Sequence, residues 1–143
     1  MWLTVKEAIK ADKVNNDIIV KGWVRTFRSN RFIALSDGTT IHTLQLVVDF
    51  ENFDEKLLRK ITTGAAIEAT GLLVESQGRG QTVELQVKEL TVLGEASADE
   101  YPLQPKKHSL EFLREIAHLR PRTNTFGAIF RIRHHLTFAI HKY

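Results

Sequence analysis

The chain has 143 residues, 43% of them hydrophobic and 26% charged, which is typical of a globular protein with one main core. It contains no cysteine, so a disulfide framework and a cysteine-based zinc site are excluded, and a reducing compartment fits. Residues 1–94 carry 12 basic and 12 acidic side chains, so the net charge of +3 arises from residues 95–143. The first part of the chain is therefore not a uniformly basic surface for nucleic acid.

The N-terminal residues predict a short helix over residues 5–11. Thr4 can accept hydrogen bonds from amides of the first turn while Glu7 reaches back, which is the pattern of a capping box. Acidic and basic residues enter this segment too early for a secretory signal peptide. No stretch of the chain approaches the ~20 apolar residues of a membrane helix, so we expect no membrane partner.

Residues 18–37 predict a long bent strand, a tight connection and a second, antiparallel strand. Gly22 interrupts the β-branched and aromatic first run, and we expect it to mark a bend or a close backbone approach. In the second strand Ile33 and Leu35 alternate with residues of a more polar face. Phe32 falls on that polar face, where a core aromatic is not expected.

The remaining β-pattern predicts three more strands, over residues 43–49, 65–75 and 82–93. Alternation places Gln45 on the outer face of the third strand and Glu84 on the outer face of the fifth. A short helical pattern lies between the third and fourth strands. This order predicts a mainly β chain built on a five-stranded OB-fold Greek-key barrel with a short helix between strands three and four.

A linker composition covers residues 95–108 and separates two predicted units, an OB domain over 1–94 and a helical unit over 109–143. The last helix of that unit, from Asn124 or Thr125, is amphipathic and, beyond Gly127 in its first turn, has no glycine or proline as a stop signal before the chain ends. The apolar positions named for its interface are Phe126, Ile129, Phe130 and Leu136. We expect this helix to pack on another chain or on the remainder of a longer protein.

The predicted outer face carries the side chains most suited to binding a nucleic acid. An exposed aromatic such as Phe32 can stack on a base for roughly 1–3 kcal/mol, although a loop or the linker could equally cover it. Gln45 and Glu84 can hydrogen-bond base edges, and each alone is commonly plain surface. Together with Arg25 and Arg28 they form a more specific set for single-stranded nucleic acid.

The other polar motifs predict no catalysis. Gly78-Arg79-Gly80 lacks the residues that follow a phosphate loop, so it predicts a hairpin turn that could offer Arg79 to a nucleic-acid backbone. The six histidines show no metal spacing, and no Ser/His/Asp set is legible. The residues therefore favour a binding module without a catalytic residue, metal or cofactor.

Two groups of motifs resemble a known family. The runs Gly-Trp-Val-Arg-Thr-Phe-Arg at 22–28 and Phe-Ile-Ala-Leu-Ser-Asp-Gly at 32–38 resemble the anticodon-binding OB domain of class IIb aminoacyl-tRNA synthetases. The runs at 101–104, 108–115 and 118–124, above all Leu-Arg-Pro-Arg-Thr-Asn, resemble the bacterial-type asparaginyl-tRNA synthetase family. The resemblance covers essentially the whole chain.

The resemblance implies a role for each polar residue of the outer face. Phe32 matches the aromatic that stacks on the central uracil of the anticodon, and Gln45 and Glu84 match polar residues that read anticodon bases. Arg28 matches a first-strand arginine near the same loop. Arg25 and Arg79 are carried over on charge and position alone.

The resemblance also implies what the rest of the protein does. The segment from Phe126 onward resembles the start of the family's first signature motif, a long helix at a homodimer interface, which would begin a truncated class II α+β catalytic domain. The ATP and amino-acid site lies in later motifs that this chain lacks. A cytoplasmic full-length enzyme would use ATP and Mg²⁺ to join asparagine to tRNA(Asn). The chain alone would bind the anticodon stem-loop and be inactive.

Two other interpretations are considered. An aspartyl- or lysyl-tRNA synthetase would share the barrel, but the run at 119–124 argues against both. The second interpretation is a free-standing OB protein that binds single-stranded nucleic acid without base preference. The zero net charge of residues 1–94 and the unfinished last helix argue against that one.

Overall fold

The computed structural model describes residues 1–10, 12–78 and 80–143. In chain order its elements are α1 (Val5–Ala8), β1 (Asp17–Arg28), β2 (Phe32–Ser36), β3 (Leu44–Val47), η1 (Phe50–Asn52), α2 (Glu55–Arg59), β4 (Ala66–Glu75), β5 (Val83–Gly94), α3 (Leu110–Glu115), η2 (Arg120–Arg122) and α4 (Asn124–Lys142). The chain divides into two compact units, Met1–Pro105 and Lys106–Tyr143. Each unit is described by itself.

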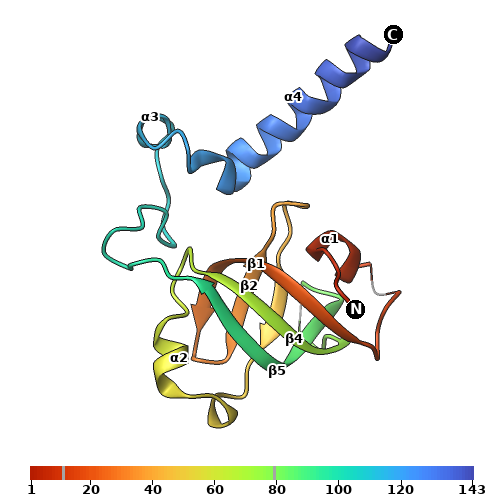
Figure 1. Cartoon of the computed structure of the whole chain (residues 1–143). Helices are drawn as coiled ribbons and strands as arrows, with labels where there is room; N and C mark the ends of the chain where they lie inside the picture. The colour runs from red at the N-terminus through yellow and green to blue at the C-terminus, as the bar shows by residue number, and fades with distance from the viewer. Residues whose placement is uncertain (11, 79) are drawn as a thin grey trace. The chain divides into compact units, whose positions relative to one another are not determined.

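The first unit is a closed barrel of five strands in the order β1-β2-β3-β5-β4. Figure 1 shows this barrel, with β1, β2, β4 and β5 labelled. Neighbouring strands are antiparallel except for β3 and β5, which run parallel and close the barrel. The short helix α2 lies in the connection from β3 to β4, as the sequence predicts. The mainly β, five-stranded barrel expected from the sequence is therefore confirmed.

The barrel interior is filled by alternate residues of each strand. Ile33 and Leu35 of β2, Leu44 and Leu46 of β3, and Leu85 of β5 have no exposed surface. Burying a side chain of this size contributes about 1.5–3 kcal/mol each, so these positions supply much of the drive to fold. The inner and outer faces assigned by alternation to β2 and β3 are both confirmed.

Two glycines allow neighbouring strands to approach closely. A Cβ on Gly22 would lie 2.7 Å from the carbonyl oxygen of Ser36, which confirms the close approach expected there. Just beyond it, a bulge makes Arg25 the extra residue of β1. A Cβ on Gly71 would overlap the carbonyl oxygen of Gln86, so β4 also needs a glycine where it faces β5.

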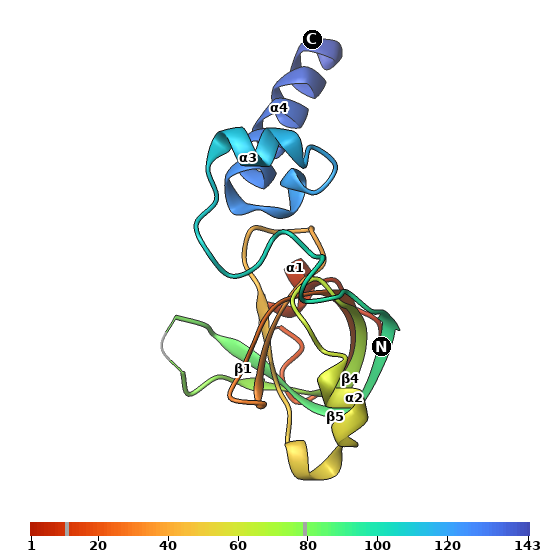
Figure 2. The ribbon, with the colours of Figure 1, turned by 90° about the vertical axis from the view of Figure 1, so that its left-hand side faces the viewer.

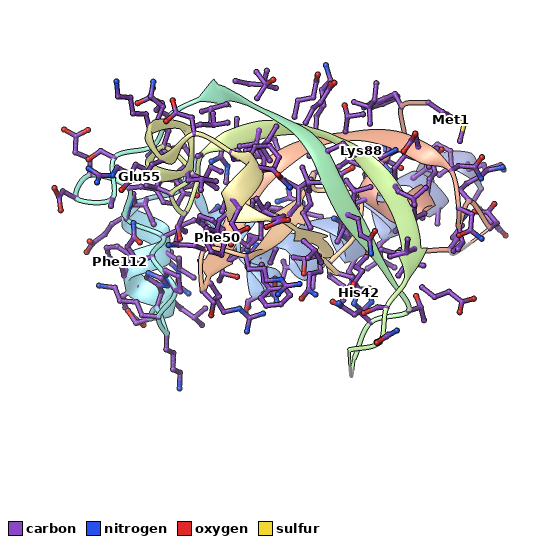
Figure 3. The ribbon with its side chains drawn as sticks, turned by 90° about the horizontal axis from the view of Figure 1, so that it is seen from below. Met1, His42, Phe50, Glu55, Lys88 and Phe112 are labelled. Carbon is purple, nitrogen blue, oxygen red and sulfur yellow. The ribbon has the colours of Figure 1, made fainter. Side chains whose placement is uncertain are left out.

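A further bulge lies in β5, opposite Gly71 of β4. Gly71 pairs with Val87 and Thr70 pairs with Glu89, so Lys88 is the extra residue of β5. Its side chain, labelled in Figure 3, lies on the outside, and its ammonium group is 2.7 Å from the carboxylate of Asp17. The inward and outward positions of β5 are therefore shifted by one residue beyond Lys88, where the strand continues to pair with β4.

The helix α1 confirms the predicted capping box. The Thr4 amide donates to Oε2 of Glu7 over 2.8 Å, and the Glu7 amide donates back to Oγ1 of Thr4 over 3.3 Å. A carboxylate oxygen of Asp37 also accepts the amide of Val5 over 2.8 Å and ties the helix to the end of β2. The helix ends at Ala8, earlier than the expected 5–11, of which Ala11 lies outside the described residues. The Ile9 amide still bonds to the Val5 carbonyl, but the Lys10 amide donates to the Glu7 carbonyl, three residues back, over 3.3 Å, which closes a tighter final turn.

The second unit consists of α3, η2 and α4. Ser109 and Thr123 cap α3 and α4, because their hydroxyl oxygens accept hydrogen bonds from the amides of Phe112 and Phe126. Arg120 places its guanidinium over the ring of Phe126 at 4.9 Å and over that of Phe130 at 5.6 Å. This contact closes η2 against the first turns of the long helix.

The other two α4 positions named from the sequence are more exposed. Ile129 exposes 47% of its surface and Leu136 exposes 61%. Phe126 and Phe130 are half-buried within their own unit by the contact with Arg120. The apolar side of α4 therefore leaves several large side chains uncovered in this chain, and their place in a dimer interface stays a prediction.

Candidate nucleic-acid interface

The β1–β2 connection positions the first two residues of the site. The carbonyl of Arg28 accepts the amide of Arg31 over 3.0 Å, and Ser29 and Asn30 between them have φ values of 54° and 49°. Two left-handed central residues define the tight hairpin turn whose twist matches that of the strands. The turn places Arg28 directly opposite Phe32 across the strand pair.

The parallel pair of β3 and β5 positions the next two residues. Gln45 lies directly opposite Glu84 in the register of this pair, although the two are 39 residues apart in the chain. The Nε2 group of Gln45 donates to Oε2 of Glu84 over 3.3 Å. Ala34 pairs with Gln45, and Phe32, on the same face of β2, pairs with Val47. The three strands therefore present Phe32, Gln45 and Glu84 together on the outer face.

These side chains surround an open hollow of about 450 Å³. It is lined by Arg28, Ser29, Phe32, Gln45, Gln77, Gly78 and Glu84, and the chain segments that meet there are the β1–β2 turn, the three strands and the β4–β5 connection. Figure 2 shows the β4–β5 connection, in green, extending away from the barrel. Four of the six residues predicted for nucleic-acid binding thus line one hollow.

The other two predicted residues lie elsewhere or cannot be placed. Arg25 is half-buried at the β1 bulge and is not among the residues that line the hollow. Arg79 lies outside the described residues. Two further basic residues near these strands interact within the barrel unit: the ammonium group of Lys21 is 2.6 Å from a carboxylate oxygen of Glu68, and the guanidinium of Arg31 lies over the Phe32 ring at 5.7 Å.

Sequence reasoning missed the part of the site that comes from the β4–β5 connection. Gln77 and Gly78 line the hollow, while Ser76 and Gln81 hydrogen-bond to Glu84 beside it. From this connection the sequence predicted a hairpin turn at Gly78-Arg79-Gly80 and proposed Arg79 alone as a contact to nucleic acid. The sequence did contain a signal for this part of the site: several hydroxyl and amide side chains flank Gly78 and Gly80, a few residues before Glu84.

The hollow combines a flat apolar surface with polar groups of several kinds. The ring of Phe32 can stack on a planar base, and Gln45 and Glu84 offer hydrogen-bond donors and acceptors next to it. Arg28 is exposed and forms no ion pair with any described residue, so its charge is available to a phosphate or a base edge. This combination suits an unpaired nucleotide better than a duplex.

The described residues contain no cluster of three or more His, Cys, Asp or Glu that could hold a metal ion. Among their helices, none is long and apolar enough to cross a membrane.

Comparison with known proteins agrees with the fold and the hollow. Residues 18–93 match the family model described as an OB-fold nucleic acid binding domain. The match covers more than half of the chain, so the chain belongs to this family of nucleic-acid-binding OB folds.

The relatives narrow the class further. Over 142 residues, or 97% of the chain, it is 54% identical to an asparagine–tRNA ligase of Parabacteroides distasonis and 56% identical to one of Porphyromonas gingivalis. The resemblance to asparaginyl-tRNA synthetase stated from the sequence motifs is thereby confirmed. The chain spans 30% of the length of these two relatives.

Solved structures show the same fold at lower identity. The asparaginyl-tRNA synthetase of Pyrococcus horikoshii complexed with asparaginyl-adenylate superposes with a TM-score of 0.80 at 23% identity, covering 98% of this chain and 33% of that one. The asparaginyl-tRNA synthetase of Entamoeba histolytica gives 0.79 at 20% identity, covering 100% and 34%. At these identities the comparison supports the fold alone.

Proposed function

We propose that this chain binds the anticodon loop of tRNA(Asn) as the anticodon-binding part of an asparaginyl-tRNA synthetase. The observation that carries the proposal is the hollow in which Arg28, Phe32, Gln45 and Glu84 meet on the outer face of an OB barrel. The family match to nucleic-acid-binding OB folds and the identity to asparagine–tRNA ligases support it.

The proposed roles follow from the chemistry of each side chain. Phe32 stacks on the central uracil of the anticodon, because a half-buried ring on a sheet surface offers one flat face to a base. Gln45 and Glu84 read base edges beside it, and the cation of Arg28 contacts the phosphate backbone or a base edge. Arg25 and Arg79 are proposed as further positive charges for the nucleic acid, on their charge and their position in the sequence alone.

The activity of the whole protein is also a proposal. The full-length enzyme would be a cytoplasmic homodimer that joins asparagine to tRNA(Asn) with ATP and Mg²⁺, and residues outside this chain would hold those cofactors. Residues 1–94 form the OB domain in this proposal, residues 95–108 a hinge, and residues 109–143 the start of the catalytic domain. The boundary between the two compact units, after Pro105, falls within that hinge, and the exposed apolar residues of α4 suit an interface helix.

The test is binding of the chain to RNA hairpins at two salt concentrations. One hairpin carries the asparagine anticodon, one the aspartate anticodon, and one a replacement of the central uracil. We expect a preference for the asparagine loop that persists at the higher salt, because base contacts lose less affinity to salt than phosphate contacts do. Equal binding to all three that collapses with salt would show a backbone-only module and overturn the proposal.

Phe50 supplies a matched control for the stacking role. It is another phenylalanine of the barrel unit, 53% exposed on η1, labelled in Figure 3 and not among the residues lining the hollow. Phe50→Ala is expected to leave the preference for the central uracil unchanged. If Phe50→Ala and Phe32→Ala weaken binding equally, the aromatic contribution is not specific to the hollow.

A further inference from the structure

One oxygen of the Glu84 carboxylate is occupied by three hydrogen bonds from within the chain. Oε2 of Glu84 accepts the Ser76 hydroxyl over 2.9 Å, and Nε2 of Gln81 and Nε2 of Gln45 each over 3.3 Å. The other oxygen, Oε1, accepts no hydrogen bond from a described residue. The carboxylate is therefore held from one side and open on the other.

The hydrogen-bonding capacity of Ser76 is fully used in this arrangement. Its oxygen accepts the amide of Gly78 over 3.1 Å and Nε2 of Gln81 over 2.9 Å, so its single proton is left for Glu84. A hydroxyl offers one donor and two acceptor positions, and all three are satisfied here. A saturated hydroxyl has one favourable orientation, and this fixes the direction in which it holds the carboxylate.

We propose that Ser76 and Gln81 are positioning residues that hold Oε2 of Glu84 so that Oε1 alone faces the bound base. This inference rests on the proposed anticodon binding and assigns to it two residues that do not line the hollow. Glu84 would otherwise sample several side-chain rotamers, and binding would have to restrict them. Since Ser76 also binds the amide of Gly78, the same hydroxyl places the rim of the hollow relative to the carboxylate.

The experiment measures hairpin affinities of the 143-residue chain for the asparagine anticodon loop and for every single-base variant of that anticodon. Glu84→Ala first identifies the base position at which discrimination depends on the carboxylate. We expect Ser76→Ala to lower affinity for the asparagine loop about three- to tenfold and to reduce discrimination at that same position. Gln81→Ala is expected to act at the same position by a smaller factor, and Ser76→Thr to restore most of the loss.

The decisive measurement is a double-mutant cycle. If Ser76 acts through Glu84, Ser76→Ala should change affinity by less than about twofold in a chain that already carries Glu84→Ala. The control is Thr82→Ala, which removes a hydroxyl near the same connection that bonds instead to the Ile9 carbonyl over 3.5 Å. Thr82→Ala should leave discrimination intact, and melting curves should show all variants folded.

Two results would overturn the inference in distinguishable ways. If the wild-type chain discriminates among loops but the Ser76 and Glu84 effects multiply independently, Ser76 does not act through Glu84 and only the positioning role fails. If the wild-type chain binds every loop equally, anticodon reading fails and the positioning role fails with it.

Discussion

The two faces of β2, β3 and β5 differ in what their residues do, although the residues alternate along the same strands. The inner face is apolar, and its members Ile33, Leu46 and Leu85 have no exposed surface. The outer face carries a half-buried aromatic ring at Phe32 and a hydrogen-bonded amide and carboxylate beside it. A spacing of one residue thus separates positions that stabilise the barrel from positions proposed to bind RNA.

The largest expected effect comes from removing an inner-face side chain. Leu46→Ala should lower the free energy of unfolding by roughly 2–5 kcal/mol, because it removes buried methyl groups and leaves a cavity. Chemical denaturation measures this. The neighbouring Gln45→Ala is the matched outer-face variant and should change stability far less. Comparable losses for the two variants would contradict the separation of the faces.

The next effect concerns the close approach of β4 and β5 beside the bulge at Lys88. Gly71→Ala should cost about 1–3 kcal/mol of unfolding free energy, because the added Cβ overlaps the Gln86 carbonyl and the strands must separate. Gly94→Ala is the control, since a Cβ there would meet only the Ala66 methyl at 3.7 Å, an ordinary contact. Thermal melting of both variants checks this, and equal melting temperatures would show that the close approach of β4 and β5 is not needed.

A third effect should appear in binding and much less in stability. Phe32→Ala is expected to cost roughly 1–3 kcal/mol of affinity for the asparagine anticodon hairpin through the loss of one base stack. Its unfolding free energy should fall clearly less than that of Leu46→Ala, since the ring lies on the outer face. Hairpin titration and denaturation of the same sample measure both. A variant that unfolds would place Phe32 in the core and remove the basis of the stacking role.

The local sequence pattern was sufficient to predict the inner and outer faces of β2 and β3. It was not sufficient to predict that Gln45 and Glu84 lie side by side. Alternation in β2 and β3 separates Phe32 and Gln45 from their buried neighbours, because a strand repeats every two residues. That Gln45 lies opposite Glu84 depends on the parallel pairing of strands far apart in the chain, which no local period encodes. Grouping these residues as one site rested on their chemistry, and the proposed roles rested on the family resemblance.

The features that the sequence did not predict depend on how far side chains extend and on the local conformation of the backbone. Ser76 and Gln81 belong to a segment predicted only as a turn, and their bonds to Glu84 follow from how β4 and β5 pair. The bulge at Arg25 rotates that residue out of the simple alternation, so its charge could not be placed on a face from spacing alone. The early end of α1 likewise depends on the final hydrogen bonds and not on residue propensity.

The smallest expected effect concerns the Thr4–Glu7 contact, which caps α1 and does not line the hollow. The hydrogen bond from the Thr4 hydroxyl over 2.6 Å, followed by the one from the Thr4 amide, holds the pKa of Glu7 below its usual value. A carboxyl whose folded pKa is lowered stabilises the protein above its unfolded pKa, which is about 4.3. That contribution is complete at pH 7 and is lost as the pH falls through the folded pKa.

Glu7→Gln isolates this contribution because glutamine keeps the length of the side chain and can still complete a capping box. The variant should be slightly less stable than the wild type at pH 7, and the difference should shrink as the pH is lowered below about 4.3. Denaturation at a series of pH values measures it, with the other carboxyls cancelling between the two proteins. Because Glu7 lies on α1 and does not line the hollow, hairpin affinity at pH 7 should be the same for both. A stability difference that persists unchanged to pH 3 would contradict this, because it would show that the contribution of Glu7 does not depend on its negative charge.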